Sequence, residues 1–163
     1  ALVQTDMLPG TEVGAVPVPV ERLGRDVVVA PIICFEVAYD QIARSSVRAG
    51  AELLLVPTNN SNFGYTAEST QLAMTRLRAI ETGRAAIQIS TVGVSAVVDP
   101  AGRVLERTGL FTAEQLLAEL PLRTSSTPAV VLGGWIELAV ALGASLLVGV
   151  GIVSGARSRS RRK

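Results

Sequence analysis

The only cysteine of the chain stands between an apolar run and a carboxylate, in the stretch PIICFEVAYD that covers residues 31–40. Cys34 lies where a buried strand is expected to give way to a helix, and this geometry exposes a side chain at the carboxyl end of a sheet. Helix N–H groups that point at a thiol acidify it and favour reactivity. A lone cysteine after an apolar strand is, however, most often a small buried hydrophobic residue. Position alone leaves both interpretations of Cys34 open.

A nucleophilic thiol needs a base and a group that stabilises the developing negative charge. The sequence contains no histidine, so a Cys-His pair within this chain is excluded. The remaining arrangement combines a carboxylate with a lysine. Glu36 is two residues away from the cysteine, but it fits a surface carboxylate at a helix N-terminus equally well. The only lysine is Lys163, the final residue, so the site is incomplete on these residues alone.

Alternating strands and helices are expected to position these residues. The order of apolar runs and helix-forming stretches is typical of an α/β layered core. The first 25 residues contain several prolines and fit a loop or a sheet edge, and residues 111–123 leave strand and helix open. The predicted strands are 26–33 and 52–57, the predicted helices are 36–50 and 68–83, and residues 85–107 are predicted to form two or three strands.

A long apolar segment near the C-terminus predicts a transmembrane helix over residues 128–155. Between Ala129 and Val153 only Glu137 is ionisable, and about 20 residues at a rise of ~1.5 Å each cross a bilayer core. Trp135 fits a headgroup position, and the basic tail at 156–163 places the C-terminus in the cytoplasm by the positive-inside rule. The alternative is a buried helix of a soluble protein, which the length and the basic flank disfavour.

Composition limits the partners of the protein. Of the 163 residues 48% are hydrophobic, which exceeds an ordinary soluble domain and fits an apolar environment. The formal net charge of +1 argues against a nucleic-acid-binding surface over the body of the protein, so we expect no nucleic-acid partner. We also expect no metal site and no cofactor.

Several motifs together resemble the C-terminal part of bacterial apolipoprotein N-acyltransferases. These motifs are a Cys-aromatic-Glu sequence, a loop, a charged helix with a following hairpin, and the opening of a hydrophobic helix. They read ICFEVAYD at 33–40, VPTNNSNFG at 56–64, QLAMTRLRAIETGRAAIQISTVGVSAVVDPAGRV at 71–104, and GGW at 133–135. Each motif alone is weak, whereas the combination favours Cys34 as a nucleophile. Family members are integral membrane enzymes with an extracytoplasmic nitrilase-like domain.

The resemblance implies that residues 1–127 are part of a nitrilase-like α-β-β-α sandwich and that a Glu-Lys-Cys triad does the chemistry. Cys34 then takes an acyl chain from a phospholipid as a thioester. It passes this chain to the N-terminal amine of a diacylglyceryl-modified lipoprotein. Glu36 is implied as the essential carboxylate beside the nucleophile, and the backbone N–H of Phe35 as an oxyanion donor. The family triad's Glu and Lys precede its cysteine, so this chain is expected to be a C-terminal fragment of a multi-pass protein of the bacterial plasma membrane.

The loop at 58–66 is expected near the nucleophile because it follows a strand of the same sheet. Asn59 and Asn60 are candidates to orient polar groups, and Phe63 is a candidate to line an acyl-chain channel. Together with Phe35 they are the predicted substrate-binding residues. An ordinary Asn/Gly turn is the alternative. Many family members have a tryptophan where this chain has Asn62, which leaves the details of substrate contact open.

In the charged helix, Arg76, Arg78, Glu81 and Arg84 are expected to form a structural ion-pair network. Two other functions stay open: a membrane-anchored nitrilase-like amidase and a non-catalytic membrane-tethered module. Half a sandwich leaves a sheet edge and a sheet face uncovered, so an isolated piece of this length is expected to fold poorly.

Overall fold

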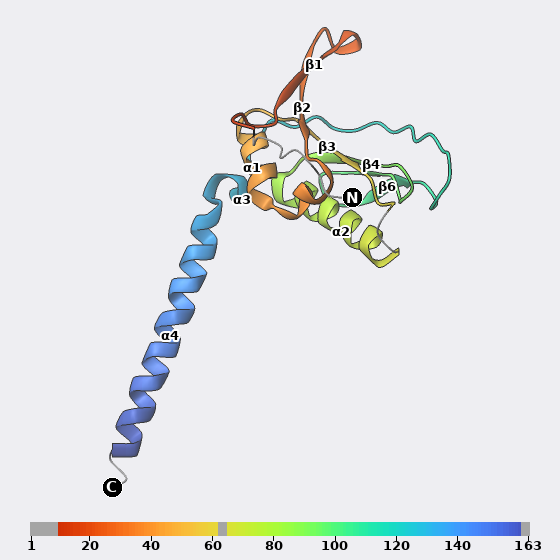
Figure 1. Ribbon diagram of the computed structural model, residues 1–163. Helices are drawn as coiled ribbons and strands as arrows, with labels where there is room; N and C mark the ends of the chain where they lie inside the picture. Colours follow the sequence, from red (N-terminus) through yellow and green to blue (C-terminus); the bar gives the residue numbers. More distant parts are fainter. Residues whose placement is uncertain (1–9, 62–64, 161–163) are drawn as a thin grey trace. The chain divides into compact units, whose positions relative to one another are not determined.

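The computed structural model describes residues 10–61 and 65–160, and for residues 65–69 and 152–160 it describes only the backbone. The chain divides into two compact units, residues 1–130 and 131–163. The first unit contains one mixed sheet of six strands in the order β1-β2-β3-β4-β5-β6 (Figure 1). The strands are β1 Val16–Val20, β2 Arg25–Pro31, β3 Leu53–Thr58, β4 Ala85–Ser90, β5 Ala96–Val98 and β6 Val104–Arg107.

The centre of the sheet is parallel and its margins are antiparallel. Strands β2, β3 and β4 run in the same direction, whereas β1, β5 and β6 pair with antiparallel neighbours. Strand β1 follows the expectation of a sheet edge: it contains Pro17 and Pro19 and pairs only with β2. An edge strand tolerates proline because one of its sides needs no backbone donor. The 3-10 turn η1 (Glu21–Leu23) connects β1 to β2.

Helices cover one face of this sheet. The turn η2 (Cys34–Ala38) and helix α1 (Asp40–Arg48) lead from β2 to β3, and helix α2 (Tyr65–Thr82) leads from β3 to β4. Right-handed crossovers between neighbouring parallel strands place both helices on the same side (Figure 1). Small and β-branched residues fill the space between helices and strands: Ala30, Ile32, Val37, Ala43, Val47, Ala51, Leu54, Val56, Ala79, Ala86, Val98 and Val130.

The opposite face of the sheet is only partly covered. Ile87 and Ile89 alternate along β4 with Gln88, whose amide bonds to Thr75 of α2, so the two isoleucines point away from the helices. Ile89 is 52% exposed. A hollow of about 370 Å³ lies between Ile87, Ile89 and the chain segment 114–120. One sheet with one helix layer corresponds to half of the expected four-layer sandwich.

Two predicted helices are interrupted in the structure, and the segment predicted as either strand or helix is neither. The predicted helix over 36–50 is divided, because Tyr39 is extended (φ −92°, ψ 106°) between η2 and α1. Residues 111–123, for which strand and helix both stayed open, form neither. The apolar segment is helical as α3 (Pro128–Leu132) and α4 (Gly134–Ser160), with a break at Gly133, whose φ of +52° is left-handed. Glycine adopts this conformation without the steric penalty of a Cβ atom.

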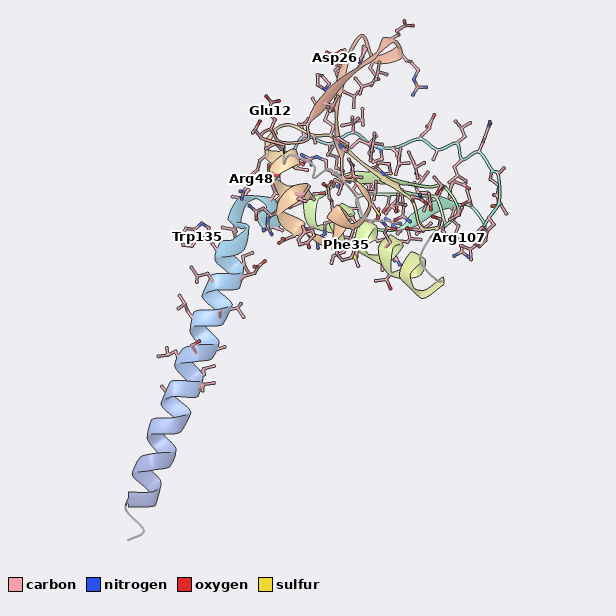
Figure 2. The ribbon with its side chains drawn as sticks, in the orientation of Figure 1. Glu12, Asp26, Phe35, Arg48, Arg107 and Trp135 are labelled. Atoms are coloured by element: carbon pink, nitrogen blue, oxygen red, sulfur yellow. The ribbon has the colours of Figure 1, made fainter. Side chains whose placement is uncertain are left out.

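Helix α4 makes up most of the second unit. Among the described residues it is the one helix long and apolar enough to cross a membrane, judged by length and composition, and its candidate span is Gly134–Gly151. The side chains along this span are exposed, including Trp135 in the first turn (73%; Figure 2). An isolated helix with apolar side chains on all sides fits a lipid environment.

The expected ion-pair network in α2 is only partly present. Glu81 contacts the guanidinium groups of Arg78 (2.7 Å) and of Arg44 in α1 (3.2 Å). Burial raises the pKa of the Glu81 carboxyl, and the two arginines oppose this shift. Arg76 instead donates to the carbonyl of Gly102 (2.7 Å), so the expectation was right for Arg78 and Glu81 and wrong for Arg76.

Arg84 also bonds to backbone rather than to a carboxylate. Its side chain is 2% exposed, and it donates to the carbonyls of Ala51 (2.8 Å) and Ser125 (2.7 Å). Burial lowers the pKa of the Arg84 guanidinium, but arginine stays charged at neutral pH. Arg48, labelled in Figure 2, donates in the same way to the carbonyl of Val130 (2.6 Å from Nη2). These arginines hold the segment that follows β6 against the rest of the first unit.

We expect Arg84→Met to destabilise the first unit by about 2 kcal/mol, because the buried Ala51 carbonyl and the part-buried Ser125 bond lose their donor, at a cost of ~1–3 kcal/mol for the buried group. Pulse proteolysis in urea, performed on membranes that contain the protein, measures this as a lower urea midpoint. The matched control is Arg103→Met, since Arg103 is 78% exposed and bonds only to nearby Asp99. Equal midpoints for both variants would show that the buried arginine contributes no more than a surface arginine.

Candidate active site

Cys34 has an unusual backbone conformation. It is the first residue of η2, three residues beyond the end of β2, and its φ of +53° lies in the left-handed region. Among the described non-glycine residues only Phe111 shares a positive φ. This conformation costs an L-residue about 1–2 kcal/mol. Backbone strain of this kind clusters at functional sites, where it orients a reactive group.

Neutral hydrogen-bond donors surround the half-buried Cys34 thiol. Thr58 ends the neighbouring strand β3, and its hydroxyl oxygen lies 3.4 Å from the sulfur. This hydroxyl is the largest influence that lowers the thiol pKa, and burial opposes it. The backbone N–H groups of Asn59 and Phe35 and the side chain of Gln71 lower the pKa further. The pKa of the thiol is lowered, as expected. The cause is a set of individual hydrogen bonds and not a helix N-terminus, because η2 is a single short turn.

Thr58 and Gln71 were not among the site residues predicted from the sequence. Thr58 Oγ1 lies 3.0 Å from Gln71 Oε1, which extends from the buried face of α2. One turn along, Thr75 Oγ1 lies 2.7 Å from Gln88 Oε1 on β4. A polar layer therefore lies between α2 and the sheet, below the thiol. The spacing of Gln71, Thr75, Arg78 and Thr82 on one helix face was the available signal.

Glu36 and Phe35 flank the thiol in different ways. The exposed Glu36 carboxylate accepts a hydrogen bond from the backbone N–H of Ile33 (2.7 Å), which closes the η2 turn around the cysteine. The Phe35 ring is 62% exposed and meets Tyr39 edge to face, with ring centroids 6.1 Å apart. Figure 2 shows Phe35 projecting from this turn. The expected roles of Glu36 in catalysis and of Phe35 in substrate binding stay predictions.

The two asparagines after β3 have distinct positions. Asn59 presents its N–H to the thiol, and its side-chain oxygen accepts from the N–H of Ser61 (3.1 Å) and the hydroxyl of Thr91 (3.0 Å). Asn60 is 3% exposed, and its Oδ1 lies 3.0 Å from Thr58 Oγ1. Phe63 lies outside the described residues. Substrate binding by these three residues stays a prediction.

A metal site is not apparent in the part of the chain that the structure describes, since no three His, Cys, Asp or Glu side chains there could hold an ion together.

Comparison with known proteins identifies the context of this site. The carbon-nitrogen hydrolase family profile matches residues 6–127. An apolipoprotein N-acyltransferase of Mycolicibacterium smegmatis is 32% identical over 154 residues, which are 94% of this chain and 25% of that protein. One from Shewanella oneidensis is 38% identical over 122 residues, 74% of this chain and 23% of that protein. The chain thus spans about a quarter of the length of these relatives.

Solved structures give the same fold. Nit3 of Saccharomyces cerevisiae, a member of the nitrilase superfamily, superposes with a TM-score of 0.55 over 66% of this chain and 40% of its own, at 19% identity. An amidase of Nesterenkonia AN1 from the same superfamily has a TM-score of 0.50 over 63% of this chain and 40% of its own, at 22% identity. The predicted nitrilase-type fold and the similarity to apolipoprotein N-acyltransferases are confirmed.

Glycine usually lowers the stability of a fold relative to alanine, and the strained backbone at Cys34 predicts the reverse order. We expect Cys34→Gly to be more stable than Cys34→Ala by about 1 kcal/mol, because glycine adopts a positive φ without a Cβ clash. Both variants lose the sulfur, so the difference isolates the backbone. To compare the two variants, membranes that contain each protein are heated, and the temperature at which the protein loses its resistance to protease is measured. A less stable glycine variant would mean that Cys34 relaxes out of the left-handed conformation.

Proposed function

Because the chain belongs to the carbon–nitrogen hydrolase family, we propose that Cys34 is the nucleophile of an acyltransferase that works through a thioester. The observation that carries this proposal is the acidified thiol at a strained turn, with neutral donors from β3, the loop after it, η2 and α2 around it. The names of the relatives supply the acceptor class, an apolipoprotein amine. The acyl donor that we propose is a membrane phospholipid.

In the first half-reaction the Cys34 thiolate attacks the ester carbonyl carbon of the phospholipid. The carbonyl oxygen becomes an oxyanion, and we propose that the N–H of Phe35 donates to it; this N–H faces the Cys34 thiol, which supports the role. The C–O bond then breaks, and the acyl group stays on sulfur. The general base that took the thiol proton returns it to the departing oxygen, so the lysophospholipid leaves as a neutral alcohol. In the second half-reaction the lipoprotein amine attacks the thioester, the same base takes a proton from the amine nitrogen, and the C–S bond breaks to release the thiolate and an amide.

The proposal requires a general base and a cation besides these neutral donors. The chain contains no histidine, and its only lysine, Lys163, is outside the described residues. Glu36 is a carboxylate close in sequence. Its described contact with the Ile33 N–H holds the turn, and its role as the essential carboxylate beside the nucleophile stays a proposal. We expect the Glu and Lys of the triad to come from the three quarters of the relatives' length that this chain does not match.

The proposed location is a bacterial plasma membrane. A span at Gly134–Gly151 would hold the first unit near the bilayer surface, where both a phospholipid and a lipid-anchored acceptor are found. The arginines at 157, 159, 161 and 162 favour a cytoplasmic C-terminus, which places the first unit outside.

Acyl-thioester trapping tests this function. Membranes that contain the protein are incubated with a phospholipid that carries a labelled acyl chain, and the protein is then treated with neutral hydroxylamine. We expect label on Cys34 that hydroxylamine releases, and we expect Cys34→Ser to reduce this labile label to background. The site is unambiguous because Cys34 is the only cysteine of the chain. Arg103→Met, a surface change, is the control that keeps labelling.

A second addition separates acyl transfer from hydrolysis. A diacylated lipopeptide with a free N-terminal amine should take up the label, and the same lipopeptide with an acetylated amine should not. Release of the label only as free fatty acid would favour a hydrolase of the amidase type. An unlabelled Cys34 would favour a non-catalytic module.

A further inference from the structure

The hydroxyl of Thr58 has more acceptors around it than it has protons. Its oxygen lies 3.4 Å from Cys34 Sγ, 3.0 Å from Asn60 Oδ1 and 3.0 Å from Gln71 Oε1. A hydroxyl donates one hydrogen bond and accepts two. With both amide oxygens facing it, only one of the three contacts can be a hydrogen bond from Thr58. The other two would be contacts between lone pairs.

The Asn60 amide has the opposite imbalance, a donor without an acceptor. Its nitrogen is buried and has no hydrogen-bond partner among the described residues, and the residue is 3% exposed. A buried amide N–H without a partner is unfavourable. Amide oxygen and nitrogen have nearly the same shape, so the hydrogen-bond network decides which faces a neighbour. Turning the Asn60 amide over gives its nitrogen a partner, the Thr58 oxygen.

We propose that the amide nitrogen of Asn60 donates to Thr58, which removes one competing acceptor and leaves the Thr58 hydroxyl proton for the sulfur of Cys34. Thr58 is then a further catalytic residue, and Asn60 is a positioning residue that acts through it. Of the two acceptors that remain near the Thr58 oxygen, Cys34 Sγ and Gln71 Oε1, the charged thiolate is the stronger. The proposal rests on Cys34 being the nucleophile of the proposed function.

Charged groups on the elements around Cys34 are engaged elsewhere. Glu36 of η2 accepts from the Ile33 N–H, and Asp40 and Arg44 of α1 pair with each other. Arg48 of α1 donates to the Val130 carbonyl. On α2, Arg76 donates to the Gly102 carbonyl, and Arg78 pairs with Glu81. Among the described side chains, neutral donors therefore set the charge state of the thiol.

The directed proton serves both half-reactions. A hydrogen bond to sulfur stabilises the thiolate that attacks the donor ester, and it stabilises the same thiolate again when the C–S bond of the thioester breaks. In the thioester itself the sulfur is neutral and accepts only weakly. Thr58 therefore favours the two ends of the reaction cycle over the covalent intermediate.

The pH dependence of iodoacetamide alkylation of Cys34, measured on the protein in membranes, tests the proposal. We expect Thr58→Val to move the midpoint to higher pH and to slow alkylation at pH 7 by about two- to tenfold, as for the loss of one hydrogen bond. Thr58→Ser keeps the hydroxyl and should keep the parent profile. Thr82→Val is the matched control, since it removes an equally buried threonine hydroxyl that bonds to the Arg78 carbonyl.

The direction of the Asn60 amide has its own test. If its nitrogen donates to Thr58, Asn60→Ala removes the donor that positions the Thr58 hydroxyl. The midpoint of the alkylation profile then moves to higher pH. If its oxygen instead accepts the Thr58 proton, the same change frees that proton for sulfur and moves the midpoint to lower pH. This sign remains decisive even if Thr58→Val fails to fold.

Any one of three results would overturn the proposal. These are an unchanged midpoint in Thr58→Val, a profile of Thr58→Ser that matches that of Thr58→Val, and an unchanged or lowered midpoint in Asn60→Ala. Alkylation needs no acyl donor, so failure of acyl transfer leaves this experiment interpretable. Conversely, acyl labelling of Cys34 together with an unshifted Thr58→Val profile would keep the proposed function and remove Thr58 from it.

Discussion

The parallel pairing of β2 with β3 is the constraint on which the candidate site depends. Val29 pairs with Leu53 and Pro31 with Leu55, and the N–H of Ile32 continues the ladder to the Leu55 carbonyl (2.8 Å). This register brings the carboxyl ends of both strands to the same sheet edge and places Cys34, three residues beyond β2, beside Thr58. A slip of one residue would turn Thr58 to the other face and take the hydroxyl away from the thiol.

The polar layer below the thiol changes how the helix layer is built. Helix α2 turns Gln71 and Thr75 toward the sheet, while Leu77 and Ile80 remain 52% and 53% exposed. A purely apolar sheet-facing side of α2 would bury more hydrophobic surface. The polar side chains therefore reduce the hydrophobic stabilisation of the core and replace it with buried hydrogen bonds. Such a layer holds one geometry when every member has a partner. It therefore suits a site in which the sulfur must face a fixed set of donors.

The described residues supply a candidate nucleophile and neutral donors, but only part of what the proposed acyl transfer needs. Hydrogen bonds lower the thiol pKa, yet none of them accepts the proton that the thiol must lose. The uncovered face of β4 is a similar gap, since Ile87 and Ile89 line a hollow instead of a packed layer. Both gaps fit a chain that spans about a quarter of its relatives. The arginine anchors at 48 and 84 show that the segment toward α4 is nevertheless firmly held.

Local patterns in the sequence determined the order of strands and helices, the place of Cys34 after a buried strand, and the apolar C-terminal helix. These features depend on residues close together in the chain, where periodicity and breakers are visible. Only the tertiary structure decided that Thr58, 24 residues from Cys34, donates to its sulfur, and that Arg84 bonds to Ser125, 41 residues away. Hydrogen bonds between distant residues depend on strand register and helix rotation, and no local pattern encodes either of them. The left-handed Cys34 has the same origin, because only the surrounding packing holds a cysteine in a conformation that its own sterics disfavour.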